Sequence, residues 1–123
     1  MTTNWSEIAE RVAATQSPAD YLPPPLPEPS PVEIDLPTVF KALSMPIRHE
    51  IVRRLATEST QFDHPCGWFG FDKPKSSLTS HFRALREAGL IRQRQYGMER
   101  RSRIRYEDLE ARFPGLLEII ING

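Results

Sequence analysis

The chain is poor in cysteine and contains no long apolar run. Cys66 is the only cysteine among 123 residues, so an intrachain disulfide is excluded. No apolar stretch approaches the roughly 20 residues that a membrane-spanning helix needs, and the N-terminal sequence MTTNWSEIAE lacks both the basic start and the apolar core of a secretory signal. We therefore expect a soluble, cytoplasmic protein that does not associate with a membrane.

The motifs of common enzyme classes are also missing. The sequence has no glycine-rich phosphate loop, no paired carboxylates in a motif setting, and no spacing typical of a Ser-His-Asp or Cys-His-Asn arrangement. We therefore expect a protein that is not an enzyme.

The formal net charge is zero, but the charges are segregated along the chain. Residues 73–106 contain ten basic side chains and two acidic ones, a local charge of +8, whereas residues 1–37 carry −5. The basic members are Lys73, Lys75, Arg83, Arg86, Arg92, Arg94, Arg100, Arg101, Arg103 and Arg105. These positive charges repel one another unless a polyanion binds them. The block therefore favours a nucleic-acid partner over a charged surface that only contacts water.

Eight of the twelve prolines lie between Pro18 and Pro37. Because proline lacks an amide donor and restricts its predecessor, this stretch predicts an extended strap, either a surface-hugging linker or a ligand for proline-binding domains. Before it, Trp5, Ile8 and Val12 recur at helical spacing and indicate a short helix at about residues 3–15. We therefore divide the chain into a helix and proline-rich strap, residues 1–35, and a folded domain, residues 36–123.

The folded domain is expected to open with two helices separated at Met45-Pro46. Their apolar stripes are Leu36, Val39, Phe40 and Leu43, then Ile47, Ile51, Val52 and Leu55. The clearest helix covers residues 76–88, where Leu78, Phe82 and Leu85 share a face and Gly89 provides the C-terminal stop. Its opposite, polar face consists of Ser76, Thr79, Ser80, Arg83, Arg86 and Glu87.

The segments IRQRQY and RRSRIRY flank Gly97-Met98-Glu99 and predict a β-hairpin. Because side chains alternate along a strand, Ile104 and Tyr106 should pack on one face and leave a cationic face opposite. That face would consist of Arg101, Arg103 and Arg105. The tail, residues 107–123, predicts one final helix with more apolar surface than a domain edge needs, and such a helix is usually an interface. Its apolar members are Leu109, Phe113, Leu116, Leu117, Ile120 and Ile121.

A polar-faced helix followed by a basic hairpin suits DNA recognition. The helix fits the major groove, where short hydroxyls and arginine can reach base edges, and hairpin arginines can bind phosphate or enter the minor groove. The helix residues placed for such contacts are Lys75, Ser76, Ser77, Thr79, Ser80 and Arg83. The hairpin residues are Arg100, Arg101 and Arg103.

Two stretches resemble the ArsR/SmtB repressors. FKALSMPIRHEIVRRLA is similar to their paired-helix opening, F-x-A-L-x-[DS]-P-x-R-x-x-I-[LV], and KSSLTSHFRALREAGLIRQRQYGMERRSRIRY to their recognition helix and wing, which contain S-x-x-S-x-H-[LF]-x-x-L-[RK]-x-A-G-L-[IV]. The match covers roughly residues 36–117. It implies a mainly α winged helix-turn-helix fold (α+β) with a small β-hairpin wing, about residues 91–106.

The resemblance further implies a homodimer, paired through its terminal helices, that represses transcription at a two-fold symmetric operator in double-stranded DNA. Ser77, Ser80, His81 and Arg83 fall on recognition-helix positions, and Arg92, Arg100 and Arg101 on wing positions. His81 borders the core stripe, so we expect it to contact phosphate or to make a core hydrogen bond. Arg48, in the second-helix signature, is expected to pack or to form a salt bridge.

The chain departs from the family where many members sense metal. Those repressors use a cysteine pair before the recognition helix or Asp and His ligands on the terminal helix, whereas this chain has FDHPCGWFGF and no histidine near its end. Asp63, His64 and Cys66 are candidates for part of a zinc or nickel site, but three ligands do not close a tetrahedral one. The favoured interpretation is a local loop and no cofactor, with Cys66 as an oxidation sensor a further alternative.

An alternative function has the same fold but does not involve DNA. In it, a winged-helix interaction module binds an acidic protein through its basic face, and the proline strap serves as a docking peptide.

Overall fold

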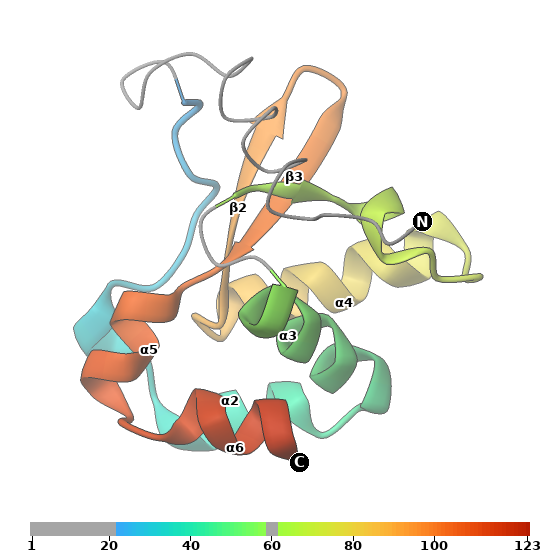
Figure 1. Cartoon of the computed structure of the whole chain (residues 1–123). Coiled ribbons are helices and arrows are strands. Elements are labelled where there is room, and N and C mark those ends of the chain that lie inside the picture. The colour runs from blue at the N-terminus through green and yellow to red at the C-terminus, as the bar shows by residue number, and fades with distance from the viewer. Residues whose placement is uncertain (1–21, 59–61) are drawn as a thin grey trace.

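The computed structural model describes residues 22–58 and 62–123. Over these residues the fold is α+β, with five α-helices and one three-stranded antiparallel sheet (Figure 1). The helix expected at residues 3–15 and the first part of the strap lie outside the described residues. None of the helices within them is long and apolar enough to cross a membrane.

The first two helices form as the apolar spacing predicts. Helix α2 (Leu36–Leu43) is capped by Asp35, whose side chain accepts the backbone N–H of Thr38 at 3.2 Å. Helix α3 (Pro46–Glu58) begins at the proline and buries Ile51, Val52 and Leu55. The expectation for Phe40 was wrong, because its side chain is 55% exposed and the smaller Ala42 takes a core position on α2 instead.

Helix α4 (Lys75–Glu87) follows the sequence expectation to within one residue at each end. Its stripe of Leu78, Phe82 and Leu85 is buried against α2 and α3. After Ala88 the chain reverses at Gly89, whose φ of 85° lies in the left-handed region, and enters the sheet.

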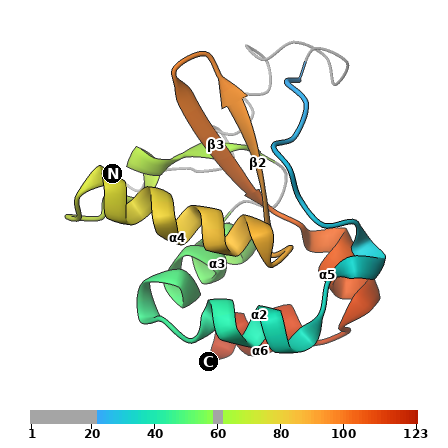
Figure 2. The same cartoon turned by 180° about the vertical axis from the view of Figure 1, so that it is seen from behind.

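The expected hairpin is present as β2 (Ile91–Tyr96) and β3 (Glu99–Ile104). It projects beyond the helices, with α4 running alongside its base (Figure 2). A third strand, β1 (His64–Pro65), pairs with β3 and gives the order β1-β3-β2. The sequence predicts a local loop here, because a strand of two residues shows no alternation. The 3-10 helix η3 (Cys66–Phe69) follows this strand and buries Phe69.

The C-terminal tail is two helices rather than the single helix expected. Helix α5 (Tyr106–Arg112) ends before Pro114, which has no amide donor, and Gly115 at φ 89° turns the chain into α6 (Leu116–Asn122). The apolar side chains expected at an exposed interface are mostly buried in this chain's own core: Leu109, Leu116, Leu117 and Ile120. Tyr106 is 40% exposed at the start of α5 and does not pack beside Ile104 as expected.

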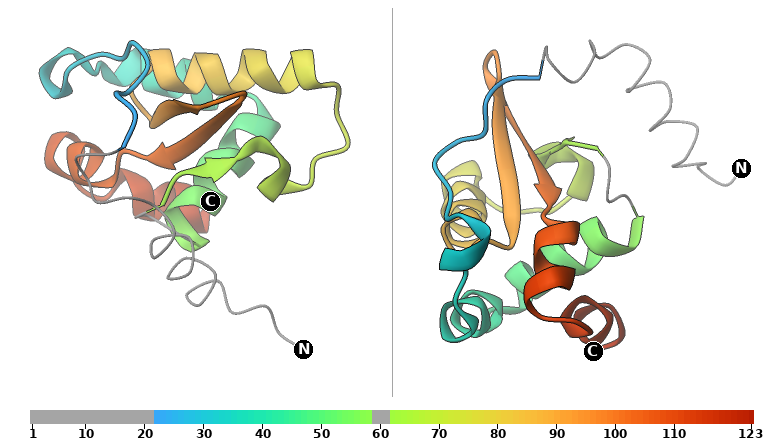
Figure 3. Two further views of the ribbon diagram at one scale, coloured as in Figure 1. Left: turned by 90° about the horizontal axis from the view of Figure 1, so that it is seen from above. Right: turned by 90° about the vertical axis from the view of Figure 1, so that its left-hand side faces the viewer.

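The described part of the strap, residues 22–35, passes the outer edge of β2 and then packs against α5 (Figure 3). Pro25 bridges to Arg94, and the backbone N–H of Leu26 donates to the carbonyl of Gln93 at 2.8 Å. The short 3-10 helix η2 (Pro31–Glu33) then leads to Ile34, which is only 1% exposed. This segment therefore covers a strand edge and supplies a core residue to the folded domain.

Candidate nucleic-acid interface

The outer face of α4 carries most of the helix residues expected to contact DNA. Their common property is exposure to solvent, and they are Lys75, Ser76, Thr79, Ser80 and Arg83. Ser77 is half-buried. Arg83 forms an exposed ion pair with Glu87, with Nε and Oε1 2.8 Å apart. Such a pair is weak in water, so the guanidinium can exchange it for another anion at little cost.

His81 is half-buried and contacts α3. Its Nδ1 accepts a hydrogen bond from Arg48 Nε at 3.1 Å, which joins the two helices. Burial lowers the pKa of His81, and the positive charges of Arg48 and Lys73 lower it further. The neutral ring can therefore accept this hydrogen bond, which is one of the two roles expected of His81 and places Arg48 in a contact between helices.

The N-terminus of α4 presents unpaired amides. The residue before the helix is Pro74, which provides no side-chain cap, and the Thr79 hydroxyl bonds back to the Lys75 carbonyl at 2.8 Å. The first N–H groups of a helix lack intrahelical acceptors, and the helix dipole favours negative charge near them. This end of α4 therefore favours anions beside the ammonium group of Lys75.

Most arginines of the hairpin form ion pairs with carboxylates that come from other parts of the chain. Asp63, whose side chain is fully buried, accepts from Arg94 Nη1 at 3.2 Å and from Arg103 Nε at 2.8 Å. Tyr96 donates its hydroxyl to the same carboxylate, and burial together with this bond raises the pKa of Tyr96 to about 12. Arg103 was expected to bind DNA, but in this structure it neutralises an internal carboxylate.

Arg92 and Arg105 are held by acids from other segments. Glu28 on the strap accepts from Arg92 at 2.8 and 3.1 Å, and its carboxylate is 2.9 Å from Arg105 Nη1. Asp108 completes the pairing of Arg105 at 3.0 Å, and the Pro29 carbonyl accepts from it at 2.7 Å. The expectation that Arg105 shares an open cationic face was wrong, because its side chain is 1% exposed.

The tip of the hairpin keeps the remaining positive charge. Arg100 is exposed and donates to Gln95 Oε1 at 3.0 Å, while Arg101 lies over the Tyr96 ring at 4.5 Å and pairs with Glu99 at 2.8 Å. The three acids from outside residues 73–106, at positions 28, 63 and 108, lower the local formal charge of +8 to +5. Cations that no buried acid holds are therefore concentrated at the tip and at the start of α4.

Arg86 was expected on the outer face of α4, but it is only 8% exposed. Its Nη1 donates to Gln93 Oε1 at 3.1 Å, and Gln93 Nε2 donates to the Ser102 hydroxyl at 3.1 Å. Burial and the neighbouring Arg100 lower the pKa of Arg86. Sequence reasoning missed this polar chain, although the alternation of a strand places Gln93 on the same face as Ile91, and Ser102 on the same face as Ile104.

The three candidate metal ligands do not come together. Asp63 is bound by arginines on one face of the sheet, whereas His64, the next residue, stacks on Trp68 with ring centroids 4.0 Å apart. Burial lowers the pKa of His64 to about 4 and raises that of the Cys66 thiol. Within residues 22–58 and 62–123, no three His, Cys, Asp or Glu side chains are grouped to hold a metal ion.

A scan against protein-family models finds none that matches the chain, and a search of curated proteins finds no significant match.

Proposed function

We propose that the chain is a winged helix-turn-helix transcriptional regulator of the ArsR/SmtB type, a repressor that binds a two-fold symmetric operator as a homodimer. Helix α4 is the recognition helix and enters the major groove. The β2–β3 hairpin is the wing, and it contacts phosphate or the minor groove through its tip. The N-terminal segment and the α+β domain act as one cytoplasmic regulatory protein.

The observation that carries the proposal is the exposed face of α4 beside the β2–β3 hairpin. Thr79, Ser80 and Arg83 leave the helix toward solvent, while the opposite face is packed in the core and joined to α3 through Arg48. A rigid helix that offers hydroxyls and a guanidinium can reach base edges, and the neighbouring Arg100 can hold the backbone. The two functions, reading bases and binding phosphate, fall on different elements.

The ion pairs of the hairpin limit how much phosphate it can bind. Lys75, Arg100 and Arg101 remain for backbone contact, so a dimer would neutralise about six phosphates and its log affinity would fall with log salt at a slope of about −5. A slope near −9 would mean that Arg92 and Arg103 exchange their internal carboxylates for DNA and raise the contacts of the dimer to about ten.

Exposed apolar side chains on α2 and α6 support the dimer. Phe40 is 55% exposed and Ile119 is 70% exposed, and both belong to helices near the end of the molecule away from the hairpin (Figure 1). Burying such side chains between two copies is favourable. Replacing Ile119 with Lys should shift sedimentation toward the monomer, and an unchanged dimer would contradict this interface.

The test is selection of DNA from a randomised double-stranded library by the immobilised full-length chain. We expect enrichment of a sequence with two-fold symmetry. With that sequence, Arg83→Ala should cost about 1–3 kcal/mol and relax the preference for one base pair, whereas Arg100→Ala should lower the salt slope by about one per subunit. Lys41→Ala, on α2, is the matched surface control and should change neither quantity.

Failure to enrich any sequence, with binding no tighter than to random DNA, would contradict the proposal. A steep salt dependence without sequence preference would favour a nonspecific architectural role. Absence of DNA binding altogether would favour the interaction module for an acidic partner.

A further inference from the structure

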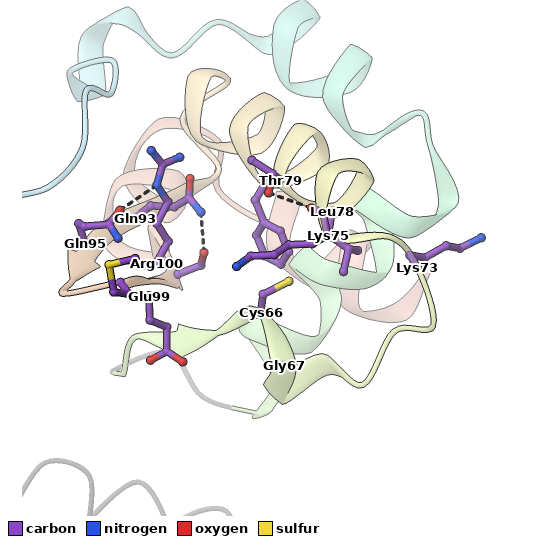
Figure 4. Close-up of a pocket in the computed structure, with 13 residues that line it drawn as sticks. Cys66, Gly67, Lys73, Lys75, Leu78, Thr79, Gln93, Gln95, Glu99 and Arg100 are labelled. Carbon is purple, nitrogen blue, oxygen red and sulfur yellow. Dashed lines mark hydrogen bonds between the residues drawn. The ribbon is translucent and has the colours of Figure 1, made fainter.

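A cavity of about 770 Å³ lies between the first half of α4 and the β2–β3 hairpin (Figure 4). Its volume falls within the range of pockets that hold small molecules, about 300–1,000 Å³. Walls come from three elements that are far apart in sequence: η3, α4 and the hairpin. The cavity is therefore a feature of the tertiary fold and not of one loop.

The inner part of the cavity is apolar. Leu78 and Phe82 reach it from α4 and are otherwise part of the hydrophobic core, and Cys66 reaches it from η3. Burial raises the pKa of the Cys66 thiol, so this group stays neutral near pH 7 and behaves as a small apolar side chain. A ligand with an apolar body would gain by covering this surface.

Positive charge faces the cavity from two sides. Lys75 extends from α4 toward the hairpin, and Arg100 lies on the hairpin wall, where Gln95 holds its Nε (Figure 4). Two other charged lining residues point elsewhere. Lys73 extends away from the cavity, and the carboxylate of Glu99 turns outward and pairs with Arg101.

A buried arginine behind the polar wall increases the preference for an anion. Arg86 touches the cavity wall through Gln93, and its Nε is buried without a hydrogen-bond partner. The two carboxylates that act on it from a distance, Glu87 and Glu28, are themselves bound by Arg83 and Arg92. A buried cation without its own counter-ion is costly, and an anion in the adjacent cavity would reduce that cost.

We propose that this cavity binds a small organic anion, with its carboxylate between Lys75 and Arg100 and its apolar body on Leu78, Phe82 and Cys66. An inorganic anion would leave the apolar wall exposed to water. A neutral apolar molecule would leave the two cations without a partner. The chemistry of the cavity therefore favours a monocarboxylate with an aromatic or alkyl body.

The same ligand would regulate DNA binding, a step that rests on the proposed function. Lys75, Thr79 and Arg100 belong both to the cavity and to the surface proposed to face DNA. An anion bound between Lys75 and Arg100 removes two contacts with DNA phosphates per subunit. It also places its negative charge beside the DNA backbone. Ligand and operator therefore compete, and the ligand acts as an inducer.

The binding test uses the full-length chain without DNA. Isothermal titration with salicylate, indole-3-acetate and octanoate should show saturable binding of at least one anion at one site per chain, and none of the neutral amide salicylamide. Lys75→Met and Arg100→Met should each weaken this binding about ten-fold, as expected for loss of a charge-assisted hydrogen bond. Lys41→Met is the matched control, and thermal unfolding checks that each variant folds.

Three results would overturn the ligand site: no saturable binding of any of the three anions, equal affinity in the folded Lys75 and Arg100 variants, or equal displacement by inorganic phosphate. The last would mark a simple phosphate subsite. Because this arm contains no DNA, a positive result stands even if the chain selects no operator. Where an operator is found, adding the bound anion should weaken DNA affinity about ten-fold at low salt, and unchanged affinity would overturn the inducer role.

Discussion

Asp63 forms hydrogen bonds to side chains on both strands of the hairpin. Its carboxylate has no exposure to solvent and receives hydrogen bonds from Arg94, Arg103 and Tyr96. These partners come from both strands of the hairpin, whereas Asp63 comes from the segment before β1. One buried acid therefore fixes three side chains and holds the third strand to the sheet.

Replacing this acid should destabilise the fold severely. Asp63→Asn leaves two partly buried guanidinium groups without a counter-charge, so we expect a loss of about 3–5 kcal/mol in the free energy of unfolding, measured by urea denaturation. The matched control is Glu99→Gln, which removes the exposed ion pair with Arg101 and should cost less than about 1 kcal/mol. Equal effects of the two substitutions would mean that Asp63 has no special structural role.

His64 gives the fold a dependence on acid. Its pKa lies at about 4, against an ordinary value of 6.5, because burial penalises the charged ring; Asp63 acts to raise this pKa and Arg103 acts to lower it. Between these two pH values the unfolded chain binds a proton at His64 and the folded chain does not. The contribution of His64 to stability is therefore complete above pH 6.5 and is lost as the pH falls toward 4.

The variant His64→Phe keeps a ring that can stack on Trp68 and removes the titration. We expect its unfolding free energy to fall less than that of the natural chain when the pH is lowered from 7 to 5, as followed by urea denaturation at each pH. Carboxylates titrate in both chains, so the comparison isolates His64. Identical pH slopes would show that the ring is protonated equally in the folded and unfolded states.

At the scale of elements, Gly89 lies where α4, β2 and the strap meet. It ends α4 and leads into β2, and a Cβ added there would lie 2.6 Å from Ile34 Cγ1 on the strap. Its φ of +85° also disfavours any residue with a side chain. The glycine therefore allows the strap to pack directly against the turn between helix and strand.

Alanine substitutions at three glycines separate the steric clash with Ile34 from the cost of a positive φ. Gly97→Ala meets only the positive φ of the hairpin turn and should cost about 1–2 kcal/mol, whereas Gly89→Ala adds the contact with Ile34 and should cost about 1–3 kcal/mol more. Gly67→Ala meets neither and should change the unfolding free energy by less than about 0.5 kcal/mol. If Gly89 and Gly97 cost the same, the strap does not pack against the turn in solution.

The elements that sequence could predict are those with a local signal. Leu78, Phe82 and Leu85 define α4 by spacing alone, and Gly97 between two alternating segments defines the hairpin. Pro114-Gly115 marks the break between the last two helices, but the apolar spacing continues on both sides of it and therefore predicts a single helix. Strand β1 has only two residues, so no period exists from which to predict it.

At the scale of the whole molecule, the ion pairs could not be predicted. Glu28 and Arg92 are 64 positions apart, and Asp63 and Arg103 are 40 positions apart. Nothing in local spacing indicates which acid meets which base, so the arginines of the hairpin looked like one free cationic face. The candidate interface within residues 75–101 stays a prediction, while the ion pairs of Arg92, Arg103 and Arg105 depend on tertiary contacts.

The proline-rich strap is the clearest case of such long-range dependence, and its contribution can be measured. Ile34 is 1% exposed, and its carbonyl accepts a hydrogen bond from Arg112 at 2.6 Å. Ile34→Ala removes a fully packed side chain and should cost about 2–5 kcal/mol of unfolding free energy, which lowers Tm by roughly 10 °C or more for a domain of this size. Val32→Ala is the control two residues away, where the side chain is 80% exposed and the cost should stay below about 0.5 kcal/mol.

Deleting residues 1–35 extends the same argument to the whole segment. The deletion removes Ile34 from the core and Glu28 from Arg92 and Arg105, and it uncovers the edge of β2. We therefore expect a larger fall in Tm than for Ile34→Ala, together with concentration-dependent aggregation, because an uncovered strand edge can pair with another chain. A deletion variant that melts like the full-length chain would mean that the strap is only a linker and that the domain is complete from Leu36 onward.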